Sequence, residues 1–123
     1  MARILVIDDE APIRELICFA LDSSGHQVAD AASGEEAMKL NRAAPADVII
    51  TDIAMPQTDG IEIIKILREE FPSTKIIVIS GVLSTTPGDN LYTATRAGAD
   101  MAFAKPFDVF EMAEAVNTLA QTS

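Results

Sequence analysis

Five polar residues that could act on phosphate or a metal ion stand at the ends of apolar, strand-like runs. They are Asp8, Asp9, Asp52, Ser80 and Lys105. Carboxylate oxygens are ligands that Mg²⁺ prefers, and a carboxylate can also be the nucleophile in phosphoryl transfer. A lysine and a hydroxyl can stabilise the charge of a phosphoryl group. If the runs are strands that end at one edge of a sheet, these residues predict phosphoryl chemistry at that edge.

Each of these residues also has a plainer interpretation. Asp8 and Asp9 can cap a helix, and Asp52 can start a turn. Ser80 precedes a glycine and can belong to a turn, and Lys105 can be a surface lysine before a proline. The plainer interpretation is the better one for each residue alone. It is much weaker for all of them together, because chance seldom places such residues at matching strand ends.

The central strand-like run is 48–50, an uninterrupted stretch of Val and Ile that Asp52 follows closely. Such a run is typical of a strand that is buried on both faces of a parallel sheet. We expect residues 53–56 to leave the sheet as a loop, because a proline cannot continue a sheet ladder.

Strand and helix patterns alternate along the whole chain. Strands are expected over 3–7, 26–31, 48–50, 75–79 and 99–104. Helices are expected to begin near Pro12, after a capping box at Ser33, near Ile61, at Asn90 and near Asp108. Short connections and right-handed crossovers then predict an α/β, doubly wound (βα)5 fold. It is a flavodoxin-like three-layer sandwich with parallel strand order 2-1-3-4-5.

This strand order makes the first and third strands neighbours, and it brings Asp8, Asp9 and Asp52 to the point where ligands bind in such sheets. Carboxylates that lie close together repel one another, and a divalent cation such as Mg²⁺ relieves the repulsion. Lys105 and Ser80 from the neighbouring strands would then stabilise a phosphoryl group attached to Asp52.

Composition limits the classes of protein that fit. The 123 residues suffice for one domain over 1–123, and the formal net charge of −10 argues against direct nucleic-acid binding. No apolar run approaches the length of a membrane span. A single cysteine, Cys18, indicates a reducing cytoplasm, and His26 is expected to be a solvated surface residue.

The chain resembles, over its whole length, the receiver domain of two-component response regulators. The stretches that carry the resemblance are 4–10, 52–56, 59–60, 98–100 and 105–107. The resemblance implies that Asp52 accepts a phosphoryl group from the phosphohistidine of a sensor histidine kinase or phosphotransfer protein. It also implies a signalling domain, not an enzyme, that switches a surface for a downstream protein target not yet identified.

The same resemblance implies a role for each residue of a magnesium site. Asp9 would be a direct Mg²⁺ ligand, Asp8 a ligand acting largely through water, and the backbone carbonyl of Ala54 a further ligand beside Asp52.

The phosphoryl group would have two partners of its own. Lys105 would pair with it, oriented by a cis Lys105-Pro106 bond, and the Ser80 hydroxyl would bind it as the switch.

Two features depart from the family pattern. Ala102 stands where receivers commonly have a rotating aromatic side chain, and alternation sends Phe103 to the opposite face of its strand. The connection from 80 to 98 is also longer than usual. These departures predict that the signal passes through Ser80 and residues 82–89.

Two alternatives stay open at this point. One is a magnesium-dependent phosphatase with an aspartyl-phosphate intermediate, although the adjacent Asp8 and Asp9 lack the spacing of that class. The other is a receiver that binds partners without phosphate. The chain is either a stand-alone receiver or part of a larger regulator.

Overall fold

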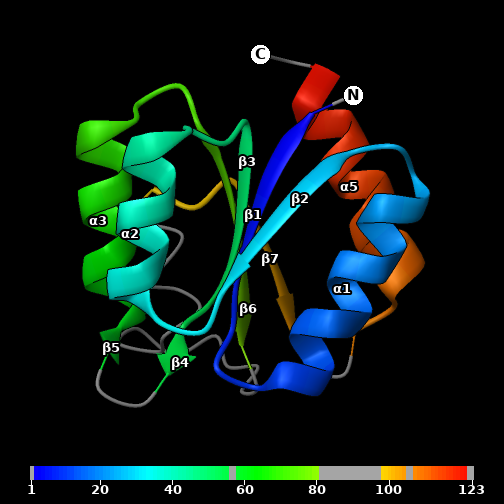
Figure 1. Cartoon of the computed structure of the whole chain (residues 1–123), viewed down its shortest axis with the longest axis horizontal. Coiled ribbons are helices and arrows are strands. Elements are labelled where there is room, and N and C mark those ends of the chain that lie inside the picture. The colour runs from blue at the N-terminus through cyan, green and yellow to red at the C-terminus, as the bar shows by residue number, and fades with distance from the viewer. Residues whose placement is uncertain (1, 56–57, 81–97, 105–106, 122–123) are drawn as a thin grey trace.

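A five-stranded parallel sheet forms the centre of the computed structural model, which describes residues 2–55, 58–80, 98–104 and 107–121. The strands are β1 (Arg3–Ile7), β2 (Gln27–Ala31), β3 (Val48–Asp52), β6 (Lys75–Ser80) and β7 (Met101–Ala104). Their order is β2-β1-β3-β6-β7, which is the predicted order 2-1-3-4-5 with these labels. The parallel strands all run downward in Figure 1, so that their carboxyl ends point away from the chain termini.

Helices cover both faces of this sheet. The helices α1 (Ala11–Ser23) and α5 (Val109–Gln121) lie on one face, and α2 (Gly34–Ala43) and α3 (Gly60–Glu70) lie on the other (Figure 1). The predicted three-layer α/β sandwich is therefore confirmed. The helix expected from Asn90 lies outside the described residues.

The core consists of two apolar clusters, one on each face of the sheet. Ile49 packs with the α2 and α3 side, and Val48 and Ile50 pack with the α1 and α5 side. All three side chains are fully buried, as their uninterrupted β-branched run predicts for a central strand. Burial of both faces holds the end of β3, and with it Asp52, in a fixed place.

Local sequence signals set where the first two helices begin. Pro12 lies in the first turn of α1, where a missing N–H costs nothing. The Ser33 hydroxyl accepts from the Glu36 N–H at 3.2 Å, and the Glu36 carboxylate accepts from the Ala32 N–H at 2.9 Å. The predicted capping box of α2 is thus present.

The segment after β3 differs from the expected loop. Two short strands, β4 (Ala54–Met55) and β5 (Thr58–Asp59), form an antiparallel ladder there. A ladder this short is compatible with the proline of this segment, because Pro56 lies between the two strands in sequence and none of their ladder positions needs its missing N–H.

The prediction for His26 is wrong, because this side chain is buried with 9% of its surface exposed. Its Nδ1 accepts from the Ala2 N–H at 3.0 Å, so the hydrogen of the uncharged ring is on Nε2 and is donated to Asn117 Oδ1. The ring therefore connects the beginning of β2 with the chain before β1 and with α5.

No helix among the described residues has the length and apolar character to cross a bilayer.

Candidate functional site

The carboxyl ends of β1 and β3 bring two buried aspartates together. Ile7 pairs with Thr51 in the parallel register, so Asp8 and Asp52 follow at the same level of the sheet. Asp8 is fully buried, and Asp52 has 3% of its surface exposed. Side-by-side strands thus produce the proximity that the sequence predicted for these two carboxylates.

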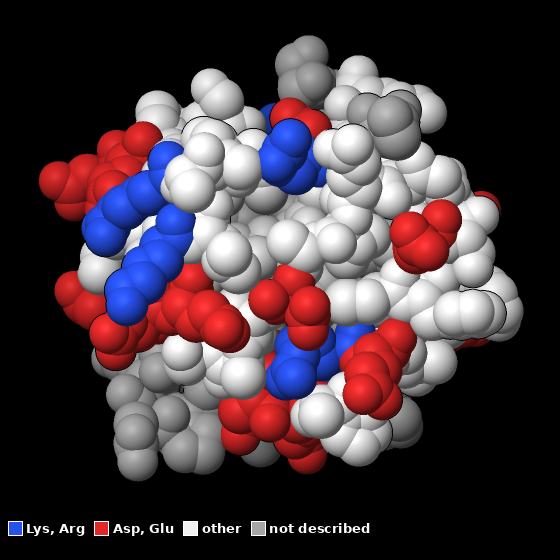
Figure 2. Space-filling model, viewed as in Figure 1, with Lys and Arg blue, Asp and Glu red and all other residues white. Residues whose placement is uncertain are grey.

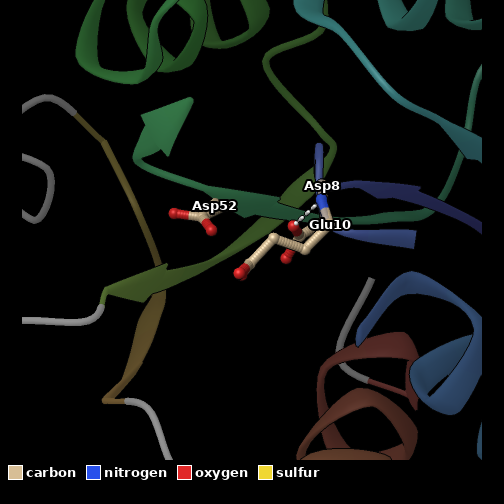
Figure 3. Close-up of side chains that lie close together, drawn as sticks. All are labelled: Asp8, Glu10 and Asp52. Carbon is tan, nitrogen blue, oxygen red and sulfur yellow. Dashed lines mark hydrogen bonds between the residues drawn. The ribbon is translucent and has the colours of Figure 1, made fainter. Parts of the chain in front are cut away.

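A third carboxylate, that of Glu10, completes an acidic cluster (Figure 3). One carboxylate oxygen from each of Asp8, Glu10 and Asp52 lies within 4.8 Å of the others. Asp8 and Asp52 are buried, whereas Glu10 is exposed. Asp9, which the sequence predicted as a direct metal ligand, is exposed and is not part of this cluster.

Hydrogen bonds in the β1–α1 turn explain why Glu10 faces Asp8. The Glu10 N–H donates to Asp8 Oδ1 at 2.8 Å, and the Glu10 carbonyl accepts from the Arg14 N–H at 3.0 Å. The Asp8 N–H donates to the Ala31 carbonyl at the end of β2 at 3.1 Å. Bonds to β2 and to α1 therefore hold the turn, and they place the carboxylates of Asp8 and Glu10 close to that of Asp52.

The chemistry of this donor set fits a hard divalent cation. Three carboxylates this close repel one another, and a bound cation relieves the repulsion. Mg²⁺ and Ca²⁺ prefer oxygen ligands of this kind, and Mg²⁺ typically uses only a few carboxylates together with water. The acidic cluster can therefore bind such an ion.

The ends of β6 and β7 lie at the same edge as the cluster. Asp52 pairs with Ile79, and the Ile53 N–H donates to the Ile79 carbonyl at 3.0 Å. Ser80 pairs in turn with Ala104, the residue before Lys105. The register thus places the backbone of Ser80 beside the strand that leads to Lys105.

Several predicted features fall outside what the structure describes. Residues 105–106, with their predicted cis bond, and residues 82–89 are not among the described residues. Ser80 and Ala54 are described only through their strands, β6 and β4. The roles proposed for these side chains and for the Ala54 carbonyl stay predictions.

The predicted arrangement of the aromatic side chain in β7 is confirmed. Phe103 is half-buried and packs against the cluster on the α1 and α5 side, whereas Ala102 is exposed on the opposite face. Phe103 therefore points away from the face on which Ala102 stands.

Sequence reasoning missed two residues near the site. The sequence did not predict Glu10 as a site residue, because nothing in it distinguishes the orientation of Glu10 from that of Asp9. Arg14, whose guanidinium contacts the Asp8 backbone at 2.7 Å, carried no signal at all, because a bond to a carbonyl does not depend on the type of residue that carries the carbonyl.

Comparison with known proteins identifies the family of this fold and site. Residues 4–117 match the response regulator receiver domain. The phosphate regulon transcriptional regulatory protein PhoB of Klebsiella pneumoniae is 37% identical over 113 residues, which are 89% of this chain and 48% of that protein. The chemotaxis protein CheY of Thermotoga maritima is 32% identical over 97% of this chain and 98% of that protein.

Solved structures agree with these relatives. The receiver domain of the Francisella response regulator 1452 superimposes with a TM-score of 0.90 at 33% identity, covering 99% of this chain and 98% of that one. The chain belongs to the receiver domain family of two-component response regulators, whose function is phosphorelay signalling. It spans about half the length of the first curated relatives it matches, such as PhoB.

Proposed function

We propose that Asp52 is the residue that accepts the phosphoryl group, and that its donor is the phosphohistidine of a sensor histidine kinase or phosphotransfer protein. The observation that carries this proposal is the position of Asp52 at the end of β3, within 4.8 Å of carboxylate oxygens of Asp8 and Glu10. Among the described residues, no other group of three or more acidic, histidine or cysteine side chains lies close enough to hold a metal ion. The downstream event is a change in a surface that binds a protein target.

In the proposed transfer a carboxylate oxygen of Asp52 attacks the phosphorus atom. The new O–P bond forms as the P–N bond to histidine breaks, and the electron pair of that bond returns to the imidazole. The product is an acyl phosphate on Asp52. The apolar residues on both faces of β3 hold the nucleophile in place during this step.

Asp8, Asp52 and the Ala54 backbone carbonyl are proposed to hold Mg²⁺, together with Asp9 or Glu10. The acidic cluster supports Glu10, and the family resemblance supports Asp9. When bound, Mg²⁺ would offset the negative charge that gathers at Asp52 and the phosphoryl oxygens.

Ser80 and Lys105 are proposed to bind the phosphoryl group itself. Lys105 would contribute a positive charge, and Ser80 would donate a hydrogen bond. Support comes from the register of β3, β6 and β7, which brings the ends of all three strands to one edge.

Three broader features belong to the same proposal. Residues 1–123 form a single receiver domain in the cytoplasm, and its only turnover is loss of its own phosphoryl group. The domain does not bind nucleic acid directly. This is supported by the net charge of −10 and by Figure 2, where basic side chains form no continuous patch among the described residues of that face.

Intact mass spectrometry after incubation with acetyl phosphate tests the proposal. We expect the wild-type chain to gain one phosphoryl group when Mg²⁺ is present and none in EDTA. The Asp52→Asn variant should gain none, whereas Asp22→Asn, on the exposed surface of α1, should behave as wild type. Equal labelling of Asp52→Asn would place the acceptor elsewhere, and turnover of a generic phosphomonoester would favour a phosphatase instead.

A further inference from the structure

Arg14 of α1 connects the turn that carries Asp8 with the end of β2. Its Nη1 donates to the Asp8 backbone carbonyl at 2.7 Å, and its Nε donates to Asp30 Oδ2 at 2.6 Å. The Arg14 side chain has only 18% of its surface exposed, against 50% for Asp30. The guanidinium therefore lies between the helix and the sheet, and it bridges two strand ends.

With the bond from Arg14, both the backbone N–H and the backbone carbonyl of Asp8 have hydrogen-bond partners. The Asp8 N–H donates to the Ala31 carbonyl at 3.1 Å, so β2 holds one side of this residue. Arg14 holds the carbonyl on the other side, and the Glu10 N–H holds the carboxylate through Oδ1. The direction of the Asp8 carboxylate thus depends on contacts from β2, from α1 and from the turn itself.

We propose that Arg14 is a positioning residue for the acidic cluster, which it serves by holding the Asp8 backbone while Asp30 holds its guanidinium. The inference rests on the proposed cation site, since its effect is exerted on the residues that bind the ion. In this role Arg14 would act without contacting the ion. It fixes the orientation in which the carboxylates of Asp8 and Glu10 meet that of Asp52.

The shape of the guanidinium explains why arginine is required. Nε and Nη1 point in two directions from one rigid plane, so one side chain can serve the Asp8 carbonyl and the Asp30 carboxylate at once. A lysine at this position keeps the charge, but its single ammonium group on a flexible stem does not fix both acceptors in that geometry.

The positive charge of Arg14 and its positioning of Asp8 should have opposite effects on cation affinity, so an experiment can distinguish the two roles. A positive charge near the cluster repels a divalent cation, and its removal alone would tighten binding. Loss of positioning weakens binding, whether or not the charge remains. Arg14→Lys and Arg14→Gln should therefore both weaken Mg²⁺ binding if position dominates.

The experiment is a calorimetric titration of the whole chain with Mg²⁺, for the wild type and both Arg14 variants. We expect the dissociation constant to rise about tenfold in each, the lower end of the effect of outer-shell residues on metal sites. The matched control is Arg42→Lys, because Arg42 also binds a carboxylate through two nitrogens, at 3.1 and 2.8 Å from Glu70, but lies on α2. The Arg42→Lys variant should bind Mg²⁺ with the affinity of the wild type.

Asp30→Asn gives a second test that leaves Arg14 in place. The asparagine oxygen can still accept from Nε, so we expect a smaller loss of affinity than in Arg14→Lys. Amide hydrogen exchange at Glu10 in EDTA should be faster in both Arg14 variants, since this N–H donates within the turn that Arg14 holds.

The outcomes separate this inference from the proposed function. A wild-type chain that does not bind Mg²⁺ would overturn the cation site itself. A wild-type chain that binds it, with unchanged affinity in Arg14→Lys and tighter binding in Arg14→Gln, would show an effect of charge alone and overturn the positioning role.

Discussion

Replacement of Arg68 in α3 should disturb the connection between α3 and the chain that enters β7. Its Nη1 donates to the carbonyls of Pro72 and Thr74 at 3.0 and 2.8 Å. Its Nη2 donates to the Gly98 carbonyl at 2.6 Å and to Asp100 Oδ2 at 2.9 Å. The side chain is 29% exposed, so one partly buried guanidinium joins the end of α3, the turn before β6 and the chain that enters β7.

The loss expected for Arg68→Ala follows from these contacts. Hydrogen bonds to charged groups contribute about 1.5–3 kcal/mol each, but bonds that share one donor group do not add. The freed carbonyls can also be hydrated in part, because the site is partly open. We therefore expect the free energy of unfolding to fall by about 2–4 kcal/mol, which lowers the melting temperature by roughly 10 °C for a domain of this size.

Urea unfolding followed by circular dichroism measures this loss, with Arg42→Ala as the control. Arg42 also lies on a helix and binds the Glu70 carboxylate, but these two side chains are 56% and 37% exposed, against 29% and 32% for Arg68 and Asp100. Exposed pairs contribute about 0–1 kcal/mol, so the control should be nearly neutral. Equal losses in the two variants would refute the reasoning, because the additional backbone acceptors of Arg68 would then not matter.

Three further predictions concern single residues. Burial, followed by the nearby charge of Asp30, raises the pKa of the Cys18 thiol from 9.0 to about 11, so at pH 8 it should react with iodoacetamide far more slowly than a free thiol. Since the unfolded chain loses this proton first, stability should fall as the pH rises from 9 towards 11, and Cys18→Ser should remove that part of the decline. Glu10→Gln should raise the melting temperature in EDTA and weaken Mg²⁺ binding, and a comparison with Asp9→Asn shows which of the two belongs to the cation site. Ser33→Ala removes the cap of α2 and should cost about 1 kcal/mol in thermal unfolding, whereas no change would mean that the cap contributes nothing.

Sequence patterns predicted those parts of the fold that depend on local or periodic signals. The apolar run of β3, the proline in the first turn of α1 and the Ser33 capping box each depend on residues close together in the chain. The approach of Asp8 to Asp52 followed from strand order, because residues after paired parallel strands must meet at one edge.

The features that sequence did not predict depend on distant or backbone partners. His26 is buried because its ring nitrogens bind Ala2 and Asn117, and 91 residues separate His26 from Asn117. Arg14 donates to one backbone carbonyl and Arg68 to three, and every residue carries such a group. The choice between Asp9 and Glu10 depends on the path of a three-residue turn, and both side chains have the same chemistry there.

Chemical location of the phosphoryl group tests the central claim most directly. The chain is treated with acetyl phosphate and Mg²⁺, reduced with borohydride, which converts an aspartyl phosphate to homoserine, and then digested and sequenced by mass spectrometry. We predict homoserine at position 52 alone, and none when Mg²⁺ is replaced by EDTA. Homoserine at position 8, or a modification that forms equally in EDTA, would contradict the assignment of Asp52 as the phosphoryl acceptor of this receiver domain.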